Sequence, residues 1–320
     1  WGWATRTYDY AARDWAYNLL MSVEPYSVLF TNGDNDTFPL WYLQEVEGIR
    51  RDVTVIVTSY LNTDWYTKQL KRLTEPCRDV DPASDWSVIK CQRPYDPSNT
   101  PAAYVTELGK AGNQTPIIIQ SISPPTRSIL PLTDQQIEEA SMAFTRLDQG
   151  VAIQIGNIEA RLPSGMLLQP WQRFALTLLV ESIDDRPIYF ASSGNAAASL
   201  GVQSYLVRQG LAFRLSNGPP ADNPRFTALT GSPYVPVTGE FVDRARTALL
   251  ADQVFIHRGD IPQWDHWPDI ATIGIPNYYS WVYLSLLEVA IKYGDIEARD
   301  RYEVLSQLWQ TLGTPEQTGL

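Results

Sequence analysis

Two patterns of apolar and polar positions alternate from the start of the chain. Short β-branched or aliphatic runs at 28–30 and 53–57 predict strands, while helical spacing predicts a helix over 37–46 between them. Residues 62–64 resemble a cap that opens a second helix reaching Leu73. A strand–helix–strand–helix series at this spacing predicts an α/β fold with parallel βαβ units and right-handed crossovers. We therefore expect a Rossmann-like parallel sheet flanked by helices.

The same patterns extend further along the chain. A capping-box sequence, Thr133-Asp134-Gln135-Gln136, opens a helix whose apolar face continues to Leu147. Residues 217–239 hold many Gly and Pro residues and predict a long surface loop. Other predicted helices cover 8–23 and 171–183, and other predicted strands cover 117–119, 151–155 and 186–191.

The C-terminal part has a different character. Residues 241–254 predict a helix and 258–276 an irregular stretch. Two longer helices follow at 278–293 and 296–312, joined by Gly294-Asp295. This pair resembles one tetratricopeptide unit, and because a solenoid needs about three units, the pair must dock on the body or on a partner.

The domain organisation follows from these changes of pattern. We predict an α/β domain over 1–240, interrupted by a Pro- and Asp-rich excursion over 75–115, and a helical region over 241–320 packed on it. No apolar run reaches the roughly 18 residues that span a bilayer. The chain is therefore expected to make at most peripheral contact with a membrane.

The composition excludes some partners. The formal net charge of −11 argues against nucleic acid, which requires a basic surface. Eleven Trp and 17 Tyr residues are a heavy aromatic load. Such residues fill large cores, and they also favour protein interfaces and carbohydrate faces.

The two cysteines lie within the excursion. A disulfide between Cys77 and Cys91 would close a loop of about 15 residues and contribute roughly 3 kcal/mol in the chain-entropy treatment. The alternative is two unpaired thiols in a reducing compartment. A disulfide points to an oxidising, extracytoplasmic location.

One acidic loop is the best candidate for chemistry. Asp34, Asn35 and Asp36 follow a strand and precede a helix, where α/β folds bind ligands. Asp34 and Asp36 could hold Ca²⁺ or Mg²⁺, but the later ligands of a calcium loop are missing. The favoured interpretation is an Asx-type turn and helix cap. With Asn62 and Asp64, which follow the next strand, these residues could also line a ligand cleft.

Other chemistry has little support. The only histidines are His257 and His266, without the partners that a zinc site needs. The sequence lacks a Gly-x-Ser-x-Gly elbow and the common Gly-rich phosphate loops, so we expect no cofactor. The segment 263–267 mixes aromatics with Asp and His as sugar sites do, although loop anchoring explains it equally.

Several segments resemble the bacterial relatives of the protein O-mannosyltransferase family. The longest segment reads LFTNGDNDTFPLWYLQE, and it resembles the region after the membrane domain in those proteins. The terminal helix pair also resembles theirs. The resembling segments are 29–45, 61–66, 186–191 and 205–214.

The resemblance implies a fold and a side of the membrane, but no activity. Glycosyl transfer in this family is expected of the membrane domain, and no position of this sequence matches its catalytic residues. We therefore expect a non-catalytic, periplasmic, membrane-extrinsic structural subunit that holds together the proteins of a membrane complex. A photosynthetic reaction-centre–light-harvesting complex is the specific complex that the resemblance suggests. The alternatives are an acceptor- or glycan-recognition domain of a membrane glycosyltransferase, and an independent hydrolase that uses paired carboxylates.

Overall fold

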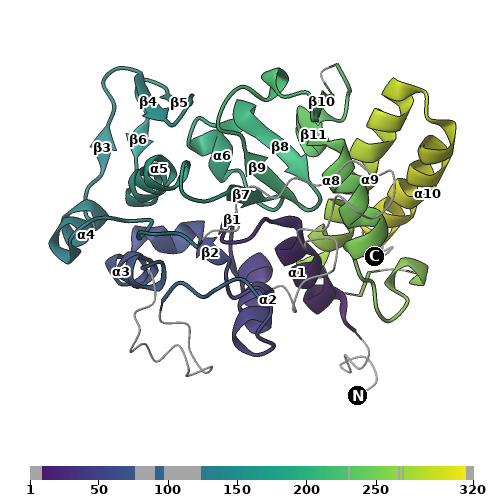
Figure 1. The fold of residues 1–320 in the computed structure, drawn as a ribbon, viewed down its shortest axis with the longest axis horizontal. Helices are drawn as coiled ribbons and strands as arrows, with labels where there is room; N and C mark the ends of the chain where they lie inside the picture. Colours follow the sequence, from purple (N-terminus) through teal and green to yellow (C-terminus); the bar gives the residue numbers. More distant parts are fainter. Residues whose placement is uncertain are drawn as a thin grey trace, which may run out of the picture.

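The structure is a computed structural model that describes residues 9–75, 91–96, 124–229, 231–265, 267–268 and 270–314. Its centre is a seven-stranded sheet in the order β10-β11-β8-β9-β7-β1-β2, with helices on both faces (Figure 1). The α/β fold class is confirmed. The predicted strand at 117–119 and most of the excursion lie outside the described residues.

The sheet is mostly parallel. Strand β1 pairs in parallel with β2 on one side and with β7 on the other, and β8 pairs in parallel with β11. Strands β9 and β10 run antiparallel to their neighbours. The strands are β1 (Val28–Thr31), β2 (Thr54–Val57), β7 (Ile188–Ala191), β8 (Leu206–Gln209), β9 (Ala212–Leu215), β10 (Phe226–Ala228) and β11 (Phe241–Asp243).

Alternation along the strands builds a core on each face of the sheet. In β1, Val28 and Phe30 enter one core, where Phe30 stacks on Phe190 with ring centroids 4.9 Å apart. Leu29 points to the other core. Helices α3 (Asp64–Leu73), α4 (Asp134–Ser141) and α5 (Pro170–Ser182) pack on the first core, and α1 (Ala11–Ser22), α2 (Asp34–Glu45), α9 (Gly274–Tyr293) and α10 (Ile296–Leu312) on the second.

Shorter elements complete the described chain. A hairpin of β4 and β5 and a two-stranded ribbon of β3 and β6 lie beside α5. The strands are β3 (Thr145–Arg146), β4 (Val151–Ile155), β5 (Ile158–Leu162) and β6 (Leu167–Leu168). The short helices are α6 (Ala196–Ser199), α7 (Val235–Thr238), α8 (Arg244–Leu249), η2 (Thr58–Asn62), η6 (Gln203–Tyr205), η7 (Pro220–Asp222), η8 (Leu250–Val254), η9 (Ile261–Gln263) and η10 (Ile270–Thr272).

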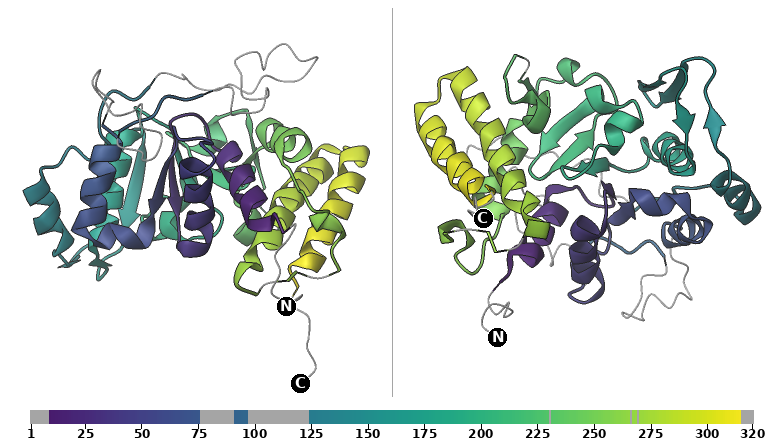
Figure 2. Two further views of the ribbon diagram at one scale, coloured as in Figure 1. Left: turned by 90° about the horizontal axis from the view of Figure 1, so that it is seen from below. Right: turned by 180° about the vertical axis from the view of Figure 1, so that it is seen from behind.

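The C-terminal helix pair is confirmed. Helices α9 and α10 lie side by side at the end of the molecule opposite α4 (Figure 2). Gly294 ends α9 in the left-handed conformation, at φ 69°, and the Asp295 side chain caps α10 by accepting from the Ala298 N–H at 3.1 Å. Tyr279 and Trp309 pack between the helices, with ring centroids 4.4 Å apart.

Three expectations about element type or length were wrong. Residues 241–243 form strand β11 before the short helix α8, although the whole segment 241–254 was predicted to be helical. The predicted loop at 217–239 contains strand β10, and the helix opened by Thr133 ends at Ser141. In each case the tertiary pairing of a strand overrides a weak local pattern. Because β11 pairs with β8, the sheet continues past the boundary predicted at residue 240, and that boundary stays a prediction.

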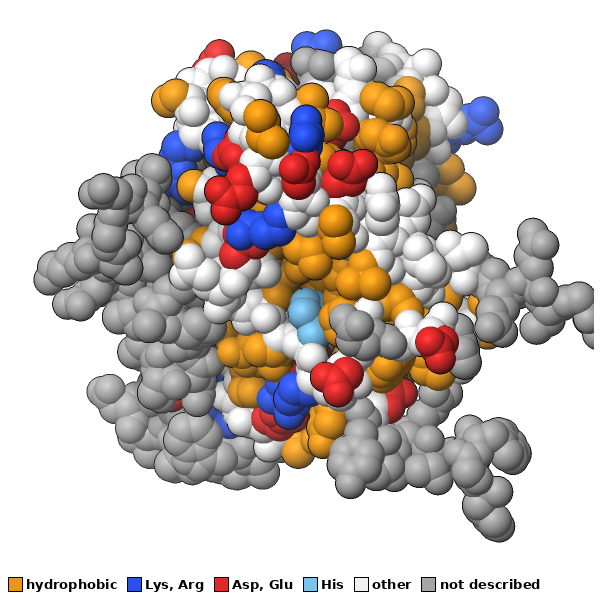
Figure 3. All heavy atoms as spheres, turned by 90° about the vertical axis from the view of Figure 1, so that its right-hand side faces the viewer, with side chains coloured by type: hydrophobic (Ala, Val, Ile, Leu, Met, Phe, Trp, Pro, Cys, Tyr) orange, Lys and Arg blue, Asp and Glu red, His pale blue; other side chains and the backbone are white. Residues whose placement is uncertain are grey.

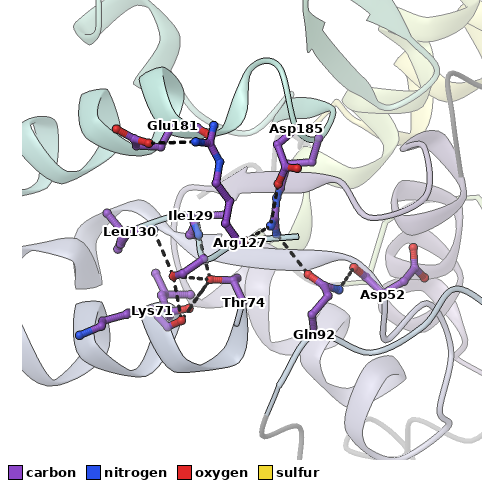
Figure 4. A network of polar contacts seen from close by, with 12 residues as sticks. Asp52, Lys71, Thr74, Gln92, Arg127, Ile129, Leu130, Glu181 and Asp185 are labelled. Atoms are coloured by element: carbon purple, nitrogen blue, oxygen red, sulfur yellow. Dashed lines mark hydrogen bonds and ion pairs between the residues drawn. The ribbon is translucent and has the colours of Figure 1, made fainter. Parts of the chain in front are cut away.

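A buried arginine fixes two loop segments to the body. Arg186, whose side chain is fully buried, donates to the Gln92 Oε1 at 3.2 Å and to the Arg127 carbonyl at 2.6 Å. Gln92 in turn donates to the Asp52 carbonyl, and the Arg127 guanidinium to the Glu181 carbonyl (Figure 4). Buried polar groups require such partners. The segment 186–191, one of those that carry the family resemblance, thus begins with a structural anchor.

Candidate functional site

The acidic loop lies at the reversal point of the sheet. From β1 the chain passes through α2 to β2, whereas β7, on the other side of β1, follows α5 on the opposite face. Loops at the carboxyl ends of such strands diverge and leave a crevice, which is where open α/β sheets bind ligands. A cavity of about 170 Å³ lies there. We call it the switch-point cavity. Its lining comes from the β1 loop, the β7 loop, α1, η10 and the start of α9: residues 32–36, Ser193, Trp15, Ala271, Thr272, Gly274, Ile275 and Tyr278.

Asp36 is a structural residue of this loop. Its buried carboxylate accepts from the Asn32 N–H at 2.7 Å, from the Gly33 N–H at 2.8 Å and from the Ser193 hydroxyl. The first two bonds cap the N-terminus of α2, and the third ties the β1 loop to the β7 loop. The cap interpretation therefore describes Asp36 well. Helix α2 begins at Asp34, three residues earlier than predicted, so Pro39 lies inside the helix rather than in its first turn.

Asp34 and Asn35 are exposed and face the cavity with few internal bonds. The Asp34 Oδ1 accepts from the Tyr60 hydroxyl at 3.4 Å, and the Asn35 amide donates to the Ala271 carbonyl at 3.0 Å. The exposed Asn32 side chain also lines the cavity. A carboxylate and amide oxygens therefore remain to accept hydrogen bonds from a ligand.

Asn62 and Asp64 do not line the cavity. The Asn62 Oδ1 accepts from the Trp171 N–H at 3.2 Å, at the start of α5. The exposed Asp64 carboxylate pairs with Lys68 at 3.0 Å, and this bond lowers the pKa of Asp64. The two residues follow β2 as expected, but the η2 turn leads them away from the β1 loop. The structure thus brings together three of the five residues predicted for a cleft.

Aromatic residues from distant segments complete the cavity, and no pattern in the sequence indicates them as lining residues. Trp15 comes from α1 and Tyr278 from α9, and their ring centroids lie 6.3 Å apart. Burial, with a smaller contribution from Asp36, raises the pKa of Tyr278, so its hydroxyl stays protonated and can donate. In the sequence, both residues occupy core positions of amphipathic helices. Helical spacing alone does not show which end of a helix lies against the edge of a sheet, so it does not indicate that they line a cavity.

The segment around 263–267 contacts a residue that lines the cavity. The Trp264 indole donates to the Gly259 carbonyl at 2.9 Å. The buried Trp267 indole donates to the Thr272 hydroxyl at 3.0 Å, and Thr272 lines the cavity. These bonds match the loop-anchoring interpretation of the segment. His266 lies outside the described residues.

The chemistry of the cavity suits a neutral, hydroxyl-rich ligand. The negative charge at Asp34 disfavours anions, while a carboxylate makes strong hydrogen bonds to hydroxyl donors. Aromatic rings offer faces for the C–H groups of a sugar ring. Within the described residues no three His, Cys, Asp or Glu side chains are grouped so that they could hold a metal ion. Both Asp36 oxygens already accept hydrogen bonds, which leaves Asp34 as the open carboxylate.

The cysteine pairing stays a prediction. Cys91 is buried and is not a free thiol. Cys77 lies outside the described residues. The Gln92 side chain beside Cys91 is held by the Arg186 network, so this end of the excursion is anchored.

Comparison with known protein families gives a match over the first part of the chain. A family model described as TMEM260-associated domain 2 matches residues 12–94, the part of the chain that includes α1, β1, α2, β2 and α3. TMEM260 is a protein family related to O-mannosyltransferases, in agreement with the resemblance seen in the sequence. No curated protein and no solved structure matches the chain. Of the helices that the structure describes, none has the length and apolar character needed to cross a bilayer. The chain is thus similar, over its first βαβ unit, to a domain associated with an O-mannosyltransferase-related family.

Proposed function

We propose that this chain is a non-catalytic, extracytoplasmic recognition domain that binds a glycan or glycosylated acceptor for a membrane glycosyltransferase of the O-mannosyltransferase-related type. The observation that carries the proposal is the switch-point cavity. It combines an open carboxylate at Asp34 with amides at Asn32 and Asn35 and with two aromatic rings. The similarity of residues 12–94 to a TMEM260-associated domain supports the enzyme class.

Calorimetry with methyl α-mannoside and short manno-oligosaccharides tests this proposal. We expect saturable binding, weak for the monosaccharide, that Asp34→Ala abolishes because the exposed carboxylate is lost while the fold is kept. Asp64→Ala is the matched control, since Asp64 occupies a comparable helix start but lies away from the cavity. Flat titrations for all the sugars, or equal losses in both variants, would exclude the cavity as a glycan site.

A second function is favoured by the outer helix pair. Ile291, Tyr293, Ile296 and Val304 of α9 and α10 are between 55% and 65% exposed. On the side of the molecule where this pair lies, Figure 3 shows hydrophobic side chains gathered across the middle, around a histidine, and hydrophobic side chains interspersed with charged ones above them. Such a surface suits a structural subunit that holds membrane proteins together.

Co-purification separates this second function from the first. A structural subunit remains with its membrane complex after gentle detergent extraction, and Ile296→Asp releases it. A chain that leaves the membrane fraction as a lone monomer would count against this function. The narrower expectation of a photosynthetic complex stays a prediction, on which none of the comparisons bears.

A further inference from the structure

A second, larger cavity lies at the β2 edge of the sheet, between α2 and α3. Its volume is about 320 Å³, inside the roughly 300–1,000 Å³ range of small-molecule sites. Trp41, Tyr60, Trp65 and Tyr66 line it, and these rings touch one another, with centroids 5.6 to 6.5 Å apart. We call it the aromatic cavity. Trp65 is 55% exposed at its mouth.

Two polar side chains in the wall of this cavity, Gln44 and Tyr66, are already engaged. The Gln44 amide donates to the carbonyls of Arg50 and Val53, at 2.8 and 2.7 Å. The Tyr66 hydroxyl accepts from the Val57 N–H at 2.9 Å and thereby covers the outer edge of β2. Because four aromatic rings line the cavity and these two polar groups are engaged, a group that fills the cavity gains mainly by burying apolar surface.

One face of helix α2 connects the two cavities. Asp34, Phe38, Trp41 and Glu45 lie at positions i, i+4, i+7 and i+11 of the helix, and so share a face. Asp34 lines the switch-point cavity, whereas Trp41 and Glu45 line the aromatic cavity. At 1.5 Å per residue, Asp34 and Trp41 are separated by about 10 Å along the helix.

Tyr60 provides a second connection. Its ring lines the aromatic cavity, and its hydroxyl lies 3.4 Å from the Asp34 carboxylate, which lines the other cavity. A polar site and an apolar site are thus joined by one helix face and by one side chain. The exposed Phe38 ring, 48% accessible, lies on the path between them and stacks on Trp41 with centroids 5.8 Å apart.

We propose that the ligand is an amphiphilic glycoconjugate, whose sugar occupies the switch-point cavity and whose apolar aglycone lies along α2 and enters the aromatic cavity. This inference rests on the proposed function for the sugar end only. The apolar end rests on the aromatic cavity itself. Burial of each methylene group strengthens binding by about fourfold, so the length of an alkyl aglycone is a direct measure of its occupancy.

A series of alkyl α-mannosides from methyl to octyl, below their critical micelle concentrations, provides the test by calorimetry. We expect the dissociation constant to fall by about fourfold for each added methylene until the chain fills the aromatic cavity. Trp65→Ala opens the mouth and Gln69→Trp fills the cavity. Both should remove the gain from the methylenes that enter the aromatic cavity, while methyl mannoside binds as before. Phe144→Ala, at another exposed aromatic position, is the matched control and should leave the series unchanged.

The outcomes separate this inference from the proposed function. Equal affinities for methyl and octyl mannoside, or a chain-length dependence that is undiminished in Trp65→Ala, overturn the amphiphilic ligand and leave the proposed function standing. If octanol binds as tightly as octyl mannoside and its binding is lost in Trp65→Ala, the result supports an apolar ligand in the aromatic cavity and overturns the proposed function. Loss of octyl mannoside affinity in both Asp34→Ala and Trp65→Ala supports the whole inference.

Discussion

At the scale of single residues, His257 connects the α8–α9 segment to the helix pair. Its ring centroid lies 4.8 Å from that of Tyr279 and 4.9 Å from that of Trp309. Within the part of the chain that the structure describes, neither ring nitrogen has a hydrogen-bond partner. Burial lowers the pKa of His257 to about 4, and the nearby Asp14, which pairs with Arg258, opposes this shift only in part. The imidazole is therefore neutral in the folded protein.

This burial predicts a loss of stability in acid. The unfolded chain binds the proton near the ordinary pKa of 6.5, whereas the folded chain binds it only near 4. Between these values the unfolded state holds more protons, so the free energy of unfolding falls as the pH drops from 6.5 to 4, by up to about 3 kcal/mol. Urea unfolding across this range measures it.

His257→Phe is the control for that measurement, because it keeps a ring between Tyr279 and Trp309 but does not titrate. We expect the variant to lose less stability than the wild type between pH 6.5 and 4, while the acidic residues contribute equally to both. Parallel pH dependences of the two proteins would contradict a buried, neutral histidine.

At the scale of elements, helix α2 shows why the type of an element is easier to predict from sequence than the residues at which it begins and ends. The sequence indicated the helix and its cap, but the polar triplet 34–36 reads as a loop. In the structure the triplet forms the first turn, because Asp36 reaches back to the N–H groups of Asn32 and Gly33 and acidic residues favour a helix N-terminus. The cap and the cavity therefore share one segment, and Asp36 shapes the loop while Asp34 remains available.

Asp36→Asn tests this division of roles. An amide presents one N–H₂ group where a carboxylate oxygen now accepts, so at least one of the N–H groups of Asn32 and Gly33 loses its acceptor. We expect the free energy of unfolding to fall by about 2 kcal/mol, measured by urea denaturation. Asp34→Asn, two residues earlier at an exposed position, should cost less than about 1 kcal/mol. Equal costs would mean that Asp36 does not hold the loop.

At the scale of the whole molecule, the sequence predicts the central β1–α2–β2–α3 unit and the terminal helix pair, and misses what joins them. Strand β9 runs antiparallel inside the sheet, and β11 lies in a segment whose pattern predicts a helix. Strands as short as these carry too little pattern to outweigh local propensity. The burial of Arg208 could not be predicted from the sequence either. The Arg208 side chain donates to the Val237 and Thr238 carbonyls at 2.6 and 2.7 Å, although arginine in a sequence normally indicates surface. The aromatic wall of the switch-point cavity is not predicted either, because its residues, Trp15 and Tyr278, are distant from each other in sequence.

The two cores share the strands of one sheet, which predicts a single unfolding transition for residues on both sides of position 240. Val28 and Leu29 are neighbours in β1 but belong to opposite cores, so neither core can open without exposing the other side of the strand. Phe174→Leu in the first core and Trp309→Phe in the second should each lower the free energy of unfolding by about 1–2 kcal/mol. In both variants, far-ultraviolet circular dichroism and tryptophan fluorescence should follow the same urea curve. An early fluorescence step confined to Trp309→Phe would show instead that the helix pair unfolds on its own, as a separate domain would.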